Sequence, residues 1–221
     1  MSSFEPYITL SDECIVEGEY SEKRSRFIAH LAHVTSEADA RSFIDEMKRT
    51  YYDARHNVSA WILADGTARS SDDGEPSKTA GKPALDVLQG MGCANICVVI
   101  TRYFGGTLLG AGGLVRAYTI ATQRALDEAM CLEKLVRVEA RQAVKLVLPY
   151  ALYDQIAHRI AQCGGTIIST DFLADVEVDC AFTHEAADAF IDSIQDLLAM
   201  RGTCEKAGIV YASSLYCKQN L

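Results

Sequence analysis

An apolar run followed by a glycine-rich segment most limits how this chain can fold. Residues 94–103 read ANICVVITRY, and a near-continuous apolar run of this kind is typical of a strand buried on both faces. The overlapping segment TRYFGGTLLGAGGLVRAYT, residues 101–119, contains five glycines. A helix is predicted to follow, from about residue 112 to 130. The chain must therefore join an interior strand to a long helix through this segment.

The glycine-rich segment has two interpretations. Free N–H groups at a helix start carry partial positive charge, and glycines let an anion approach the backbone closely. Arg102 at the strand end and Arg116 in the helix could then clamp an oxyanion. The alternative is a tight strand–helix turn with two surface arginines. The candidate ligand- or anion-binding residues are Lys78, Lys82, Arg102, Tyr103, Gly105, Gly106, Gly110, Gly112, Gly113 and Arg116.

A polar loop, SSDDGEPSKTAGKP at residues 70–83, supplies the candidate acids Asp72, Asp73 and Glu75. They could bind Mg²⁺ or act as acid–base groups, although Asp and Gly also build solvated turns, which we consider the better interpretation. The loop is not a nucleotide-binding P-loop, because six residues separate its Gly from its Gly-Lys pair. His56 and Asn57, before the next strand, are accessory candidates, and a structural histidine is the commoner case. No spacing establishes a metal site.

Charge and composition argue against extensive nucleic-acid binding, secretion and membrane insertion. The chain has 21 Lys+Arg against 30 Asp+Glu, a net charge of −9, so only a local basic patch could attract nucleic acid. Its eight cysteines form no C-x-x-C pair. The N-terminal residues have no signal-peptide pattern, and no apolar run is long enough to span a bilayer. We expect a cytoplasmic protein with reduced thiols that does not enter membranes.

The pattern of elements predicts an α+β chain of two domains, residues 1–135 and 136–221. In the first, strands are predicted at 25–34 and 57–65. A helix that Ser36 caps is predicted between them, and a short helix is predicted from Pro83. After about residue 132 the order reads β-α-β-β-α-β, which is the ferredoxin-like pattern.

Two long motifs carry a family resemblance. RSSDDGEPSKTAGKPALDVLQG and VVITRYFGGTLLGAGGLVRAYT closely resemble the signature of the YigZ/IMPACT family, and SRFIAHLAHV and RHN resemble its earlier blocks. The resemblance implies an N-terminal domain with the ribosomal-protein-S5 domain-2-like fold. It also implies a C-terminal domain similar to the last domain of elongation factor G. Two positions depart from the pattern: Lys78 stands where many relatives have Gly, and Val58-Ser59 where Cys-Trp is common.

The resemblance also bears on function. Eukaryotic relatives regulate translation initiation through an additional N-terminal RWD domain, for which this chain is expected to lack room. We therefore predict a translation-associated regulatory or binding protein that contacts RNA or the ribosome through its N-terminal domain. Phosphate contacts would come from Lys78, Lys82, Arg102 and Arg116, and Tyr103 would stack on a base.

Two alternatives stay open. One is an enzyme that binds a nucleotide or another phosphorylated small ligand, with Mg²⁺ held by the acidic cluster and nucleoside triphosphate hydrolysis as its reaction. The other is a protein–protein adaptor without a ligand. The sequence identifies no cofactor and leaves open whether any reaction is catalysed.

Overall fold

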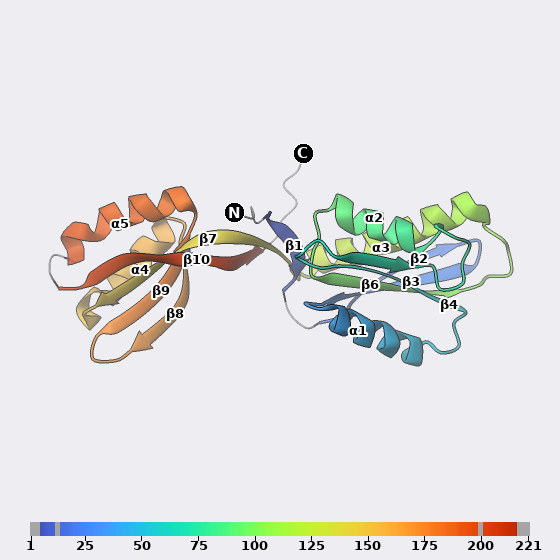
Figure 1. Ribbon diagram of the computed structural model, residues 1–221, viewed down its shortest axis with the longest axis horizontal. Coiled ribbons are helices and arrows are strands. Elements are labelled where there is room, and N and C mark those ends of the chain that lie inside the picture. The colour runs from blue at the N-terminus through green and yellow to red at the C-terminus, as the bar shows by residue number, and fades with distance from the viewer. Residues whose placement is uncertain (1–4, 12–13, 199–200, 216–221) are drawn as a thin grey trace. The chain divides into compact units, whose positions relative to one another are not determined.

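A computed structural model describes residues 5–11, 14–198 and 201–215 (Figure 1). The chain divides into two compact units, one comprising mainly residues 6–138 and the other mainly residues 139–212. Each unit has its own buried apolar cluster and is described by itself.

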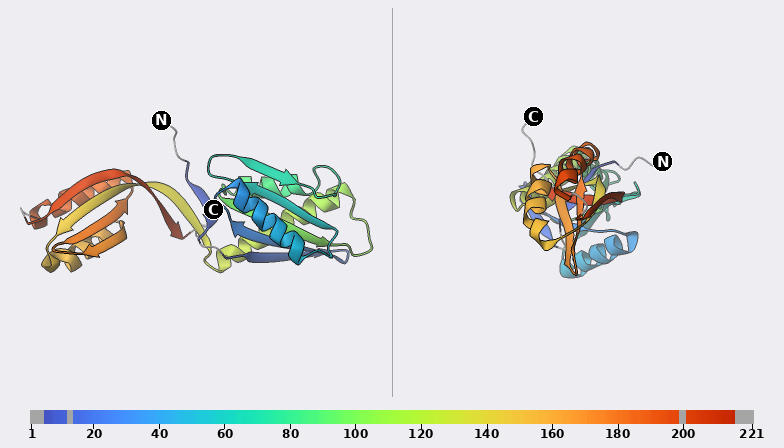
Figure 2. Two further views of the ribbon diagram at one scale, coloured as in Figure 1. Left: turned by 60° about the horizontal axis from the view of Figure 1, so that its bottom comes forward. Right: turned by 90° about the vertical axis from the view of Figure 1, so that its left-hand side faces the viewer.

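The larger unit is built on a five-stranded antiparallel sheet in the order β2-β3-β6-β4-β5. Its strands are β2 (Val16–Glu22), β3 (Ser25–His33), β4 (His56–Ile62), β5 (Ala68–Ser71) and β6 (Ile96–Tyr103). Every residue of the central strand β6 except its last is buried. The expectation of a strand buried on both faces is confirmed, because helices cover both sides of this sheet (Figures 1 and 2).

One face of the sheet packs on α1 (Glu37–Thr50), whose buried Phe43 and Met47 join Trp61 of β4 in one cluster. Ser36 caps this helix by accepting the Asp39 N–H at 3.1 Å, as its sequence pattern predicts. The other face packs on α2 (Gly81–Gly90) and α3 (Gly110–Cys131). Helix α3 lies so close to β2 that a Cβ on Gly18 would be 2.2 Å from the Ala125 nitrogen.

The smaller unit follows the predicted β-α-β-β-α-β order. Its elements are β7 (Leu135–Leu148), the 3₁₀ turn η1 (Tyr150–Leu152), α4 (Tyr153–Gln162), β8 (Thr166–Phe172), β9 (Val176–Phe182), α5 (His184–Leu198) and β10 (Thr203–Leu215). Strand β7 pairs with β9 and β10, and β9 pairs with β8. The first residues of β7 belong to the larger unit, where they pair with β1 (Tyr7–Leu10).

The α+β class is confirmed, whereas the likeness to ribosomal protein S5 and to elongation factor G stays a prediction. The sequence reading missed the short or polar strands β1, β2 and β5. Six of the described cysteines carry free thiols: Cys93, Cys97, Cys131, Cys163, Cys180 and Cys204; Cys217 lies outside the described ranges. Among the residues that the structure describes, no helix is long and apolar enough to cross a membrane.

Candidate functional site

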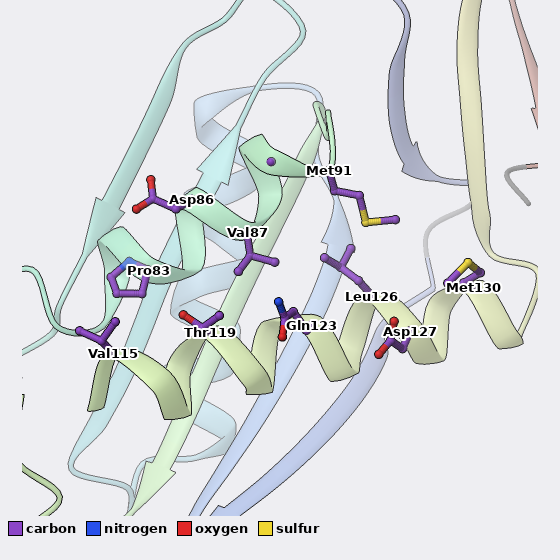
Figure 3. Close-up of a pocket in the computed structure, with 11 residues that line it drawn as sticks. Pro83, Asp86, Val87, Met91, Val115, Thr119, Gln123, Leu126, Asp127 and Met130 are labelled. Carbon is purple, nitrogen blue, oxygen red and sulfur yellow. The ribbon is translucent and has the colours of Figure 1, made fainter. Parts of the chain in front are cut away.

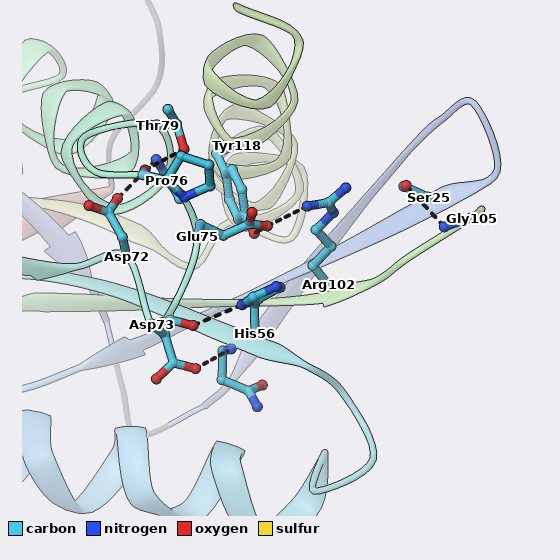
Figure 4. Close-up of polar contacts among 12 residues, drawn as sticks. Ser25, His56, Asp72, Asp73, Glu75, Pro76, Thr79, Arg102, Gly105 and Tyr118 are labelled. Atoms are coloured by element: carbon cyan, nitrogen blue, oxygen red, sulfur yellow. Dashed lines mark hydrogen bonds and ion pairs between the residues drawn. The ribbon is translucent and has the colours of Figure 1, made fainter. Parts of the chain in front are cut away.

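The acid that opens the polar loop, Asp72, organises the start of helix α2 (Figure 4). One carboxylate oxygen accepts the N–H groups of Ala80 at 3.1 Å and Gly81 at 2.9 Å. The other oxygen accepts the Lys78 N–H at 2.8 Å. Because the helix cap residue, Ala80, has no polar side chain, Asp72 supplies the acceptor that the helix start needs.

The second acid, Asp73, ties the same loop to strand β4 and helix α1. Its carboxylate accepts the Asn57 N–H at 2.7 Å and pairs with Lys48 at 2.8 Å. Its carbonyl oxygen lies 2.8 Å from Nδ1 of His56, so this nitrogen carries the proton. Asn57 is buried, and its amide oxygen accepts the hydroxyl of Thr101 at 2.7 Å. His56 and Asn57 thus anchor the loop to the sheet.

The third acid, Glu75, joins the polar loop to the glycine-rich segment through a buried ion pair. Its Oε1 lies 2.5 Å from Nη1 of Arg102 and accepts the Tyr118 hydroxyl at 2.8 Å. The Glu75 and Arg102 side chains are 4% and 7% exposed. Burial, and then the adjacent Glu75, raise the pKa of Tyr118, so its hydroxyl remains the donor. Figure 4 shows these three side chains converging from the loop, β6 and α3.

The aromatic surroundings of Arg102 keep it away from solvent. Its guanidinium carbon lies 5.3 Å from the ring centre of Phe27 and 5.7 Å from that of Phe104. Its Nε is buried without a hydrogen-bond partner among the described atoms. Arg102 is therefore held inside the unit rather than presented on its surface.

The three predicted acids use their oxygens on internal donors. Within the described residues, no group of three or more His, Cys, Asp or Glu side chains is arranged to hold a metal ion. Magnesium binding by Asp72, Asp73 and Glu75 stays a prediction.

The glycine-rich segment divides into a packed end and an open end. A Cβ on Gly105 would lie 2.0 Å from the carbonyl carbon of Arg24, and the Gly105 N–H donates to the Ser25 hydroxyl at 3.1 Å. Gly106 and Gly110 have φ angles of +86° and +71°, and a Cβ on either would meet open space.

Helix α3 then starts without a side-chain cap. Its cap residue, Leu109, makes no capping hydrogen bond, which leaves the N–H groups of the first turn without a side-chain acceptor. A Cβ on Gly112 would meet open space, whereas one on Gly113 would lie 3.0 Å from the Leu109 Cβ.

The tight turn between β2 and β3 lies directly against Gly105. Glu22 pairs with Ser25, so Lys23 and Arg24 form a two-residue hairpin loop with φ angles of +47° and +67°. Such a loop favours Asn-Gly, because positive φ brings the Cβ atom of other residues too close to the following carbonyl oxygen. Here it carries two exposed cations instead.

Further exposed groups surround this turn. Arg26 and Arg116 are 53% and 68% exposed and pair with Glu19 at 2.8 Å and Glu22 at 3.1 Å. Hydrogen bonds from Tyr20 and then Arg116 lower the pKa of Glu22, which keeps this carboxylate charged. Phe104, next to Gly105 in the chain, is 48% exposed. We call these residues the basic end: Lys23, Arg24, Arg26, Phe104, Gly105, Gly106 and Arg116.

Comparison with known proteins places the chain in a family. The Impact N-terminal domain matches residues 23–126, and a domain of unknown function, DUF1949, matches residues 146–199. IMPACT family member YigZ of Escherichia coli (strain K12) is 39% identical over 178 residues, which cover 79% of this chain and 85% of YigZ. The chain belongs to the IMPACT family. IMPACT family member YvyE of Bacillus subtilis (strain 168) is 32% identical over 192 residues, covering 86% of each chain. A crystal structure described as a hypothetical protein is 31% identical, with a TM-score of 0.55, and covers 92% of this chain and 98% of that one.

The remaining predicted residues of this IMPACT family chain are dispersed. Lys82 pairs with Asp86 on α2, and Lys78 is exposed in the polar loop with a φ angle of +62°. Tyr103 is half-buried and donates its hydroxyl to Asp53 at 2.9 Å. Sequence reasoning missed Lys23 and Arg24. The signal that could have revealed them is the position of EKRS between two complementary strands, of which only the second was recognised.

Proposed function

We propose that this IMPACT family chain is a translation-associated regulatory protein that contacts single-stranded RNA through the basic end. The observation that carries the proposal is the Lys23–Arg24 turn. Two exposed cations in an unfavourable backbone conformation indicate a role for their charge rather than for stability.

The surroundings of the turn fit an RNA backbone and its bases. The exposed cations of the turn beside Gly105 suit phosphate oxygens, and Gly106, which has open space around it, lets these oxygens approach the backbone. The exposed ring of Phe104 offers a stacking surface for a base. The few cations, set in a chain of net charge −9, predict modest and strongly salt-sensitive affinity.

The translation part of the proposal rests on the family. The resemblance carried by the two long motifs implies relatives in eukaryotes that regulate translation initiation, and we extend a translation-associated role to this chain. Contact with RNA or the ribosome is the mode of action that the basic end supports best.

Fluorescence anisotropy with a labelled oligouridine of about 12 nucleotides tests this proposal. Arg24→Gln should weaken binding and reduce the salt slope by about 0.7, the change for one lost phosphate contact on a single strand. Arg41→Gln is the matched control, because Arg41 is 72% exposed and pairs with Glu37 on α1 rather than at the basic end. Equal effects of the two substitutions, or the absence of salt-sensitive binding, would contradict the proposal.

The uncapped start of α3 favours a second candidate, a site for a nucleotide or another small phosphorylated ligand. Calorimetric titration with ATP, with and without Mg²⁺, tests it. Binding that Gly110→Pro or Gly106→Val abolishes, and Arg24→Gln leaves unchanged, would favour this candidate over RNA.

A further inference from the structure

Helices α2 and α3 leave a groove of about 840 Å³ between them on the outer side of the larger unit (Figure 3). Its apolar lining comes from both helices: Pro83, Val87 and Met91 on the α2 side, and Val115, Leu126 and Met130 on the α3 side. This volume lies within the range of about 300–1,000 Å³ typical of sites that bind a ligand group. The groove is distinct from the basic end.

The shape and lining of the groove suit a helix better than a small rigid ligand. A groove between two packed helices accepts the apolar face of a third helix, whose anchors recur every three or four residues. The lining residues of α3 recur every three or four positions, Val115, Thr119, Gln123 and Leu126, so the groove runs along one face of this helix for about three turns. The flexible side chains of Met91 and Met130 can adapt to the anchors of a partner. Gly90 presents no side chain and has open space around it.

The acidic lining of the groove favours a partner that carries positive charge. Its lining, within the part of the chain that the structure describes, contains the acids Asp86 and Asp127 and no lysine, arginine or histidine. Asp86 already pairs with Lys82. Asp127 is exposed, and no ion pair to it is found among the described residues. Arg116 of α3 pairs instead with Glu22 of β2. An acidic, apolar groove repels phosphate, so RNA is not its occupant.

We propose that this groove binds an amphipathic helix of a protein partner, with apolar anchors between α2 and α3 and a lysine or arginine facing Asp127. The N-terminal domain then presents two separate surfaces, and the chain could connect a nucleic acid to a protein. The proposal does not depend on RNA binding, because no residue of the basic end lines the groove.

The test uses the full chain and a synthetic 18-residue helical peptide of leucine, alanine and lysine, about five turns long, with its leucines on one face. We expect saturable binding at one peptide per chain. Asp127→Lys should weaken binding about fivefold or more, since an attraction becomes a repulsion. The matched control is Glu128→Lys, which makes the same charge change at the neighbouring exposed residue outside the groove and should leave binding unchanged.

A second variant fills the groove. Thr119→Trp should abolish binding, and Val115→Gln, at a residue that is 39% exposed, should weaken it without unfolding the chain. Circular dichroism checks that each variant is folded.

Three results would overturn the proposal. One is equal binding of a peptide of the same composition with its leucines scattered around the helix. Another is equal binding by the Asp127→Lys and Glu128→Lys chains. The third is self-association of the unmodified chain that Thr119→Trp abolishes, because a second copy would then occupy the groove.

Discussion

The polar loop at residues 70–83 and the uncharged part of the glycine-rich segment at residues 104–113 each lead from a strand into a helix, but the structure uses them in opposite ways. In the polar loop, Asp72, Asp73 and Glu75 all accept hydrogen bonds from internal donors. In the glycine-rich segment, Gly106 and Gly110 have positive φ angles and face open space, and α3, which begins at Gly110, has no side-chain cap. The charged loop therefore stabilises the fold, and the uncharged segment is the one left available to a ligand.

The difference shows that charged residues alone do not locate a site. A carboxylate that accepts two or three hydrogen bonds inside the chain has little capacity left for a ligand. Backbone N–H groups without an acceptor can still donate hydrogen bonds to a ligand.

The largest effect should come from breaking the buried ion pair between Glu75 of the polar loop and Arg102 of β6. Glu75→Ala leaves the Arg102 charge buried and unpaired, and should lower the free energy of unfolding by about 3–5 kcal/mol. The control Asp86→Ala removes the exposed partner of Lys82 and should cost less than about 1 kcal/mol. Urea denaturation measures both. A similar small cost for the two substitutions would mean that the polar loop does not hold the fold together.

The next effect compares two glycines of the same segment. Gly105→Ala must push apart the backbones of Gly105 and Arg24 and should destabilise the chain by about 1–3 kcal/mol. Gly112→Ala places a methyl group in open space within a helix and should stabilise it by about 0.5–1 kcal/mol. Thermal unfolding followed by circular dichroism distinguishes them. A destabilising Gly112→Ala would show that the open end is packed after all.

A smaller effect is expected at the start of α2. Asp72→Asn keeps the shape of the side chain but replaces one acceptor oxygen by an NH₂ group that cannot accept, at a cost of about 1–2 kcal/mol. Asp45→Asn on the exposed side of α1 makes the same chemical change and should be nearly neutral. Chemical denaturation of both variants provides the measurement. If Asp72 instead acts in a metal site, its substitution will leave stability unchanged and alter the response of the chain to added Mg²⁺.

The last effect is a small gain in stability, expected at the hairpin loop between β2 and β3. The double substitution Lys23→Asn and Arg24→Gly gives the hairpin loop the residues that positive φ favours, and should raise stability by up to about 1 kcal/mol. The same variant should bind oligouridine more weakly, because two exposed cations are lost. Denaturation and anisotropy on one preparation measure both quantities. A variant that is less stable, or that binds RNA equally well, would contradict the proposal that Lys23 and Arg24 lower stability but strengthen RNA binding.

Much of the architecture could be predicted because apolar periodicity reflects burial directly. The run ANICVVITRY predicted β6, and helical spacing after Ser36 predicted α1 with its cap. Strand β2 was missed because VEGEYSE contains three glutamates and a glycine, and the reason for that glycine is the close approach of α3. Strands β1 and β5 have four residues each, which is too short for a clear pattern.

The sequence by itself determined the family, the α+β class and the segments rich in charge or glycine, because these follow from local composition and spacing. Only the tertiary structure decided which polar groups are already satisfied. Glu75 and Arg102 are 27 residues apart in the chain and meet inside the larger unit, whereas Lys23 and Arg24 remain exposed beside Gly105, about 80 residues away. Hydrogen bonds between residues so distant in sequence depend on how strands and helices pack, and packing decides which charges are buried and which remain for a ligand.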